Sequence, residues 1–199
     1  MKRIVTMLMA PALLLAVGCS QAPNEKMAEA EKAVLDAKLG GAQAYVPEDY
    51  AKLEGMLNNA KTEVAEQNGK FALFRDYGKA EQMLASVKAE TPKLLEETAK
   101  KKAEAKEAAL KAHQAAKAAV KKAQALVAKA PVGKDRAAVE AIRNDAKALT
   151  ASLDEVQLAM EQEDYLTAQA KAKAVQDKSM ALSAEVRGAM AKAGGAKKK

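Results

Sequence analysis

The chain has 199 residues, of which 49% are hydrophobic and only 3% aromatic, and its formal net charge is +7. Its 48 alanines make up about half of the apolar fraction, and alanine buries too little area to support one large compact core. Long helices packed along alanine-rich seams fit better, because Ala, Lys, Glu, Leu and Met favour helix over strand. The single cysteine excludes an internal disulfide framework, and the single histidine excludes most histidine-based metal sites and catalytic triads.

The first residues have the pattern of a secretory signal. Residues 1–3 are Met-Lys-Arg, residues 4–15 form an apolar run broken only by Thr6 and Pro11, and small residues lead to Cys19. The run is about a dozen residues, short of the ~20 that span a bilayer, so a retained transmembrane helix is the weaker interpretation. Residues 1–18 are therefore predicted to be a signal peptide that is removed.

The end of this segment, Leu15-Ala16-Val17-Gly18-Cys19, resembles the lipobox of bacterial lipoproteins. The resemblance implies that the thiol of Cys19 is diacylated and that its new amine is acylated, with palmitate as a typical fatty acid. Residues 19–23 would then form a lipidated tether. Several acyl chains, at ~0.8 kcal/mol per buried methylene, make a durable anchor. In such lipoproteins Ser20 after the cysteine implies the outer membrane. We therefore expect a lipid-anchored protein of the cell envelope that faces the periplasm.

A leading helix is predicted directly after the tether. Asn24 can cap it, it runs to about Leu39, and Gly40-Gly41 weaken or end it. Pro47, which is followed by two acidic residues, then indicates a fresh helix start. Proline suits the first turn of a helix, and acids favour the positive end of its dipole.

Beyond Pro47, apolar residues recur at spacings of three and four, which predicts one buried helical face. That face comprises Leu53, Leu57, Ala60, Val64, Phe71 and Phe74, with a weak point at Asn68-Gly69. A second helix is expected to begin near Asp76-Tyr77, and Pro92 should kink or restart it. If the helix were continuous to Lys129, it would extend on the order of 80 Å at 1.5 Å per residue.

Residues 100–130 are nearly pure Ala, Lys and Glu, and we predict that they form a basic connecting helix. Between residues 100 and 129 nine lysines face two glutamates, a charge of +7, whereas residues 187–199 carry +5. The helix has an alanine seam of its own, comprising Ala105, Ala109, Ala112, Ala116, Ala119, Ala123, Leu126 and Ala130. A seam of such small side chains gains little hydrophobic energy, so it needs length, a partner helix or both.

The lysines of this helix are candidate contacts for anionic headgroups, cell-wall polymers or acidic proteins. The five candidates are Lys100, Lys101, Lys102, Lys121 and Lys122. The alternative is that these lysines only solvate an alanine-rich helix. Nucleic acid is not an expected partner, because the protein is exported and no aromatic residues are interleaved to stack on bases.

The second half of the chain repeats the plan of the first. Residues 49–61 align without gaps to residues 135–147 with six identities, and Asp76-Tyr77 with Ala80 matches Asp164-Tyr165 with Ala168. We interpret this as an internal duplication of one helical hairpin. The predicted organisation is repeat 1 with its leading helix at 24–99, the connecting helix at 100–130, repeat 2 at 131–192 and a flexible basic tail at 193–199.

Two apolar stripes in repeat 2 predict an antiparallel helix pair, with Asp164 as the N-cap of its second helix. The first stripe comprises Val139, Ile142, Ala146, Leu149, Leu153, Val156 and Met160. The second comprises Tyr165, Ala168, Ala172, Val175, Ser179, Leu182, Val186 and Ala189. The tyrosines at the hairpin tips are interpreted as packing wedges, with a binding role as the alternative. The predicted fold class is thus all-α: elongated antiparallel helical hairpins in a coiled-coil-like bundle.

Residues with catalytic potential form no recognisable constellation. His113 has no second histidine or cysteine to join it and is expected to be an exposed helical side chain. No serine stands in a Gly-x-Ser-x-Gly context. The acidic cluster of Glu161, Glu163 and Asp164 suits capping better than calcium, because no Asp-x-Asp-x-Asp-Gly loop exists. We predict a protein that is not an enzyme and has no metal or cofactor.

Two stretches carry a family resemblance. Ala44-Tyr45-Val46-Pro47-Glu48-Asp49-Tyr50-Ala51-Lys52-Leu53-Glu54, followed by Tyr77-Gly78-Lys79-Ala80-Glu81, resembles a family of small bacterial lipoproteins with an Ala-rich helical domain of unknown function. The likeness covers about residues 10–100 and implies a location and a fold but no activity. Cys19-Ser20 and a lysine end are also similar to the major outer-membrane lipoprotein, and this implies peptidoglycan attachment at Lys199. The end Gly-Gly-Ala-Lys-Lys-Lys departs from that family's pattern.

The sequence therefore favours a membrane-anchored periplasmic lipoprotein that acts as a structural spacer, scaffold or interaction module. One alternative is a tether between the outer membrane and peptidoglycan through Lys199. Another is a non-catalytic accessory subunit of an envelope enzyme or transport system. A homo-oligomer remains open, because an alanine seam serves an intramolecular hairpin and a homotrimer equally well.

Overall fold

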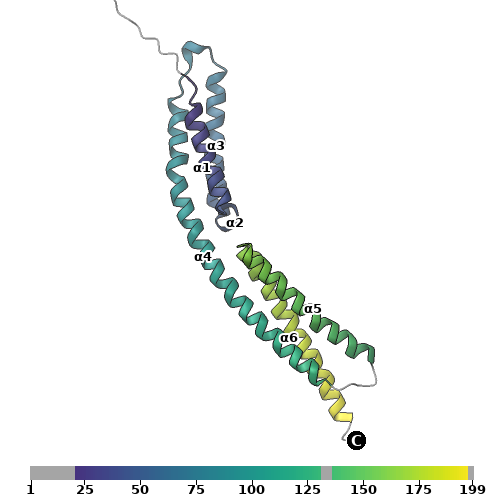
Figure 1. The fold of residues 1–199 in the computed structure, drawn as a ribbon. Helices are drawn as coiled ribbons and strands as arrows, with labels where there is room; N and C mark the ends of the chain where they lie inside the picture. The colour runs from purple at the N-terminus through teal and green to yellow at the C-terminus, as the bar shows by residue number, and fades with distance from the viewer. Residues whose placement is uncertain (1–20, 131–135, 197–199) are drawn as a thin grey trace, which may run out of the picture. The chain divides into compact units, whose positions relative to one another are not determined.

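The computed structural model describes residues 21–130 and 136–196, and α-helices make up nearly all of these ranges (Figure 1). The helices are α1 (Asn24–Leu39), α2 (Ala42–Tyr45), α3 (Pro47–Asn68), α4 (Gly78–Lys129), α5 (Arg136–Glu161) and α6 (Tyr165–Ala196), and Ala72–Phe74 forms the 3₁₀ turn η1. The prediction of an all-α helical bundle is confirmed. No helix in the described ranges combines the length and the apolarity needed to cross a membrane.

Helices α1 and α3 begin and end where local signals predict. Helix α1 covers Asn24–Leu39, and α3 begins at Pro47 with two acids in its first turn. Between them Gly41 has a φ of 96°, a left-handed conformation that favours glycine, and it precedes the short helix α2. A Cβ on Gly41 would also lie 3.2 Å from the ring of Tyr45. This glycine therefore lets the chain turn sharply out of α1.

The chain folds into two compact units. Of the described residues, the first unit comprises 21–39 and Pro47–Leu94, and the second comprises Gly40–Val46, 95–130 and 136–196. Helix α4 contributes its first part to one unit and the remainder to the other. The predicted boundary between residues 99 and 100 therefore lies inside α4, and the segment Gly40–Val46 belongs with residues far along the chain.

The first unit packs α1, α3 and the beginning of α4 around small and medium side chains, and α1 lies beside α3 in Figure 1. Its buried apolar residues are Ala30, Val34, Ala37, Tyr50, Leu53, Leu57, Ala60, Val64, Tyr77, Ala80, Leu84, Val87 and Leu94. Tyr50 donates a hydrogen bond to Glu54 at 2.8 Å. Burial, together with this bond, raises the pKa of Tyr50 to about 12.

The prediction that Phe71 and Phe74 continue the buried face of α3 is wrong. Helix α3 ends at Asn68, where the sequence has its Asn-Gly weak point, and the chain then leaves the helical period. Phe71 and Phe74 lie in the following turn and are 70% and 75% exposed. A 3.6-residue spacing carries no information about burial once the helix has ended.

The second unit packs the later part of α4 against α5 and α6. Helices α5 and α6 run antiparallel with many Cα pairs within 8 Å, a close approach that the alanines on their facing sides allow (Figure 1). The predicted stripe of α6 is confirmed except for Ala189, which is exposed while Met190 is half-buried. On α5, Ala146, Leu149 and Val156 are buried as predicted.

The buried seam of α4 differs from the predicted one in its later part. Val120 and Val127 are buried, whereas the predicted Ala119 and Leu126 are only half-buried. Each valine lies one position after the predicted residue. The buried seam Ala116, Val120, Ala123 and Val127 therefore steps by four and then by three residues, whereas the predicted seam steps by three and then by four. At position 120, burying the valine removes more apolar area from water than burying the alanine before it. At position 127 side-chain size gives no such reason, because the half-buried Leu126 is larger than Val127.

His113 also lies on the buried side of α4, and the prediction that it is exposed is wrong. Only 9% of the residue is accessible to solvent, because it occupies a seam position between Ala109 and Ala116. Burial, reinforced by the charge of Lys117, holds the pKa of His113 below its ordinary value. The small neighbouring alanines leave room for the imidazole ring.

Helix α4 continues through Pro92, so of the two predicted effects the restart is wrong, whereas the kink stays a prediction. Proline lacks an N–H and cannot donate to the carbonyl of Lys88, but Pro92 and Lys88 are both exposed, where water can satisfy that carbonyl. On the buried side, the hydroxyl of Thr91 donates to the carbonyl of Val87 at 2.8 Å. The missing backbone hydrogen bond thus lies on the exposed side of α4, where its loss destabilises the helix least.

The two sequence repeats share some structural positions. Tyr77 and Tyr165 are both buried at the start of their helices, as are Ala80 and Ala168. The connections differ, because residues 69–77 separate α3 from α4, whereas only residues 162–164 separate α5 from α6. The internal duplication stays a prediction. Helix α6 also continues to Ala196, beyond the predicted boundary at residue 192, because the glycines near its end weaken a helix without blocking it.

Candidate binding surfaces

The turn between α5 and α6 is the centre of a polar cluster in the second unit. Asp164 caps α6 by accepting a hydrogen bond from the backbone N–H of Thr167 at 3.1 Å, as predicted. The hydroxyl of Tyr45 donates to the backbone carbonyl of Glu163 at 3.1 Å. The turn therefore binds a segment that lies more than a hundred residues earlier in the chain.

Lys102 completes this cluster. Its Nζ lies 2.6 Å from Oε2 of Glu163, and the side chain is 32% exposed. The hydrogen bond between the two raises the pKa of Lys102 and lowers the pKa of Glu163. Nζ of Lys106 lies 5.9 Å from the ring centroid of Tyr165, within cation–π range. Lys102 thus has a partner inside the fold, and Tyr165 is a packing residue at the hairpin tip.

The other predicted lysines lie on the outside of α4. Lys101 pairs with Glu104 one turn later at 3.2 Å. Lys100, Lys121 and Lys122 are exposed, and in the described part of the chain they form no ion pair. Their role as contacts for an anionic surface stays a prediction. Cys19 and Lys199, the predicted lipidation and peptidoglycan-attachment residues, lie outside the described residues.

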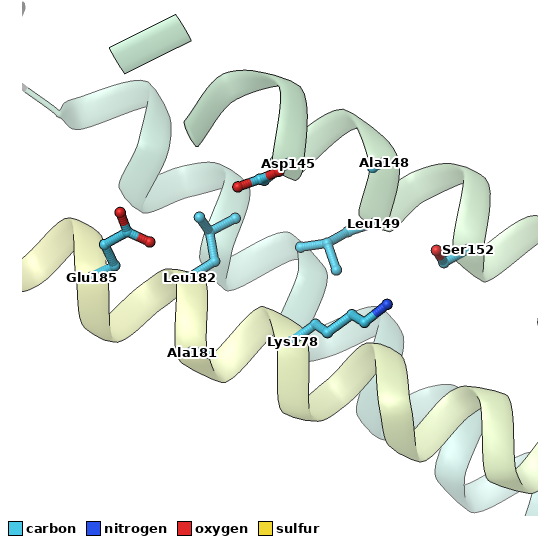
Figure 2. A pocket seen from close by; sticks show the side chains of 8 residues that line it. All are labelled: Asp145, Ala148, Leu149, Ser152, Lys178, Ala181, Leu182 and Glu185. Atoms are coloured by element: carbon cyan, nitrogen blue, oxygen red, sulfur yellow. The ribbon is translucent and has the colours of Figure 1, made fainter. Parts of the chain in front are cut away.

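A groove of about 410 Å³ runs between α5 and α6 (Figure 2). It is lined by Asp145, Ala148, Leu149, Ser152, Lys178, Ala181, Leu182 and Glu185. Leu149 and Leu182 form its apolar floor, with the carboxylates of Asp145 and Glu185 toward one end and Lys178 and Ser152 toward the other. An apolar floor with charges of opposite sign at its ends suits an amphipathic peptide or helix.

The groove does not have the geometry of a hydrolytic site. Ser152 lies at the opposite end from both carboxylates, and His113 is not among the lining residues. A serine nucleophile needs a base within hydrogen-bond reach. Within the described ranges, no group of His, Cys, Asp and Glu side chains could hold a metal ion.

The connection between α3 and α4, residues 69–77, is held by polar contacts that point into the first unit; we call it the 69–77 turn. Nζ of Lys79 lies 2.5 Å from Oε2 of Glu63, and Gln67 donates to Glu63 at 2.9 Å. The pKa of Glu63 is lowered by these hydrogen bonds from Lys79 and Gln67. The amide oxygen of Gln67 in turn accepts the backbone N–H of Asp76 at 3.1 Å.

Two further side chains close the same turn. The hydroxyl of Tyr77 donates to Oδ1 of Asn68 at 2.5 Å. The guanidinium of Arg75 donates to the backbone carbonyls of Lys70 and Asn68, each at 3.0 Å. Hydrogen bonds from Arg75, Asp76 and Tyr77 therefore fix the shape of the turn.

The apolar side chains of the 69–77 turn point the other way. Phe71, Leu73 and Phe74 are 70%, 63% and 75% exposed, and the two rings lie with their centroids 6.3 Å apart. Large exposed apolar groups gathered at one place mark interaction surfaces. The spacing of the two phenylalanines predicts a place in a core, although Asn68-Gly69 marks the end of the helix that would bury them.

No protein-family model, no curated protein and no solved structure matches this chain. The resemblance to helical lipoproteins therefore stays an expectation from the residues that carry it.

Proposed function

We propose that this protein is a lipid-anchored, non-catalytic lipoprotein of the cell envelope that acts as a helical spacer or scaffold. The observation that carries the proposal is Cys19 at the end of a lipobox-like segment, five residues before α1 begins at Asn24. An acylated Cys19 would leave only a short tether between the membrane and the folded helices. The periplasm is the compartment that this arrangement implies.

The surface of the second unit supports a scaffold role. The groove between α5 and α6 offers an apolar floor with charged ends, and exposed lysines on α4 add basic contacts. Scaffolds act by presenting such surfaces on rigid elements. The antiparallel pair of α5 and α6, with its capped turn, is a rigid element of this kind. A partner helix with an apolar stripe is the expected occupant of the groove.

The anchor is tested by metabolic labelling. Cells that express the full chain are grown with an alkyne-bearing palmitate analogue and fractionated, with Cys19→Ala as the variant and Ser20→Ala as the matched control. The wild-type and control proteins should be labelled and sediment with membranes, whereas Cys19→Ala should be unlabelled and released from them. An unlabelled wild-type protein, with Cys19→Ala still in the membrane, would overturn the anchor.

The scaffold role is tested by photo-crosslinking from the groove. A photoreactive residue replaces Ala148 or Ala181 in the groove, and Ala151, which is exposed on α5 outside the groove lining, serves as the control. A discrete crosslinked protein from the groove positions alone supports a scaffold or accessory subunit. If no such product forms and lysozyme releases the protein with a muropeptide on Lys199, the chain is instead a peptidoglycan tether.

A further inference from the structure

We propose that the 69–77 turn is a membrane-contact site, in which Phe71, Leu73 and Phe74 enter the interfacial layer of the bilayer that holds the Cys19 lipids. This inference rests on the proposed lipid anchor. It concerns a different part of the chain, which the anchor alone would leave in water.

The first argument is the direction of the side chains in the turn. Its polar groups bond back into the first unit through Glu63, Gln67 and Asn68, while its three large apolar side chains face outward. These contacts hold the turn in a shape that exposes the three apolar side chains. Aromatic and aliphatic side chains displayed in this way suit the boundary between headgroups and acyl chains.

The second argument is where the lipidated segment meets the fold. Ala22 and Met27 pack against the buried cluster of Val64, Tyr77 and Ala80. Tyr77 is the last residue of the 69–77 turn, so the chain that comes from Cys19 joins the first unit at the same end as the turn. Ala22 and the 69–77 turn thus lie at one end of the first unit although about fifty residues separate them in sequence.

The length of the tether sets how far the membrane can lie from this end. Three residues of extended chain, at about 3.3–3.6 Å each, reach about 10–11 Å from Ala22 to Cys19. Interfacial elements bury their apolar faces by about 5–10 Å. An anchor at Cys19 would therefore keep Ala22, and the end of the unit on which Ala22 packs, within about 11 Å of the lipidated residue.

The charge around the tip points to lipid as the occupant. Lys70 and Arg75 outnumber the one acid of the turn, Asp76, whereas Lys79 is already paired with Glu63. Basic residues beside an apolar tip suit a surface of anionic headgroups. A protein partner and a second copy of this chain are the other occupants that the experiment separates.

The test places a fluorophore on the tip of the lipidated protein. An acylated Cys19 has no free thiol, so Leu73→Cys provides a single site for an environment-sensitive NBD label, and Lys52→Cys, exposed near the start of α3, provides the matched control. Both proteins are reconstituted into vesicles of phosphatidylethanolamine and phosphatidylglycerol. We expect NBD at position 73 to shift to the blue and to be quenched by lipids that carry a spin label near the headgroup, and NBD at position 52 to do neither.

Two outcomes would overturn the inference while the anchor stands. NBD at position 73 in a water-like environment would show that the turn stays out of the membrane. A blue shift that lipid quenchers do not affect, and that grows with the protein density in the vesicle, would assign the tip to another copy of the chain.

A second measurement does not depend on lipidation. The chain from Ser20 onward contains every residue that the structure describes, and it is sedimented with the same vesicles as wild type and as Phe71→Ser/Phe74→Ser. Both positions are exposed, so the helical circular dichroism should be unchanged. Membrane partitioning should fall about tenfold or more on losing two aromatic side chains. Equal partitioning of the two forms would contradict the inference even if Cys19 proved not to be acylated.

Discussion

At the scale of single residues, the most consequential departure from expectation is His113. A lone histidine among lysines and alanines indicates a solvent-exposed side chain, yet it lies in the buried seam of α4. The spacing of the seam is compatible with burial of either Ala112 or His113, because the two residues are adjacent. The structure buries the larger side chain, His113. Which of the two residues is buried depends on how α5 and α6 pack against α4, and the spacing within α4 alone does not determine that packing.

The burial of His113 predicts a pH dependence of stability. Its folded-state pKa lies below the ordinary value of 6.5, because burial and the Lys117 charge disfavour the protonated ring. The unfolded chain takes up the proton first as the pH falls, so this contribution to stability is complete above pH 6.5 and is lost as the pH falls through the folded-state pKa. His113→Leu should remove this part of the acid sensitivity.

Nuclear magnetic resonance measures this directly, because the chain has one histidine and hence one imidazole Hε1 signal to follow. The pKa from that signal in the folded protein should lie below the value for the same protein in urea. A folded-state value equal to or above the value in urea would contradict the expectation that burial disfavours the protonated ring.

At the scale of elements, helix starts and stops were predictable wherever the signal is local. Asn24, Leu39 and Pro47 bound α1 and α3 as expected, because caps, glycine and proline act through the backbone of their own neighbours. The stripes of α5 and α6 were predictable because both helices keep one period throughout. Phe71 and Phe74 were not, since their spacing fits a helix that had already ended.

The cap of α6 gives a prediction at this scale. Asp164→Ala removes the acceptor for the Thr167 N–H and should lower the free energy of unfolding by about 1 kcal/mol. Asp164→Asn should retain most of the stability, because asparagine caps about as well as aspartate. The measurement is urea unfolding followed by circular dichroism.

Asp154→Ala, which removes an exposed aspartate from the middle of α5, is the matched control and should change the free energy of unfolding by less than about 0.5 kcal/mol. An equal loss from Asp154→Ala and Asp164→Ala would mean that lost charge, and not lost capping, sets the effect.

At the scale of the whole molecule, the division into two units could not be predicted from the sequence. The basic composition of residues 100–130 suggested a separate connecting segment, but α4 belongs partly to each unit, and the division falls between Leu94 and Leu95. Composition reports the charge of the exposed faces, whereas the units are defined by buried contacts between helices far apart in sequence. The joining of Gly40–Val46 to the second unit is such a contact.

Two cores predict two unfolding transitions. Leu84 is fully buried in the first unit and Leu182 is 6% exposed in the second, so replacing either with alanine should cost about 2–5 kcal/mol. In calorimetry of the chain from Ser20 onward, Leu84→Ala should chiefly lower one transition and Leu182→Ala the other. Leu158→Ala, at a side chain that is 54% exposed, is the control that should move neither. One transition lowered equally by both core substitutions would show a single cooperative unit.

The hydrogen bond between Tyr45 and the carbonyl of Glu163 affects the order of folding during synthesis. The two residues are 118 positions apart. At about 5–20 residues per second, a ribosome needs on the order of 6–24 s to make the intervening chain. Helices α1 and α3 can pair during that interval, but Tyr45 between them must wait for an acceptor that does not yet exist. The N-terminal part of the protein is therefore finished only when the turn between α5 and α6 has been made.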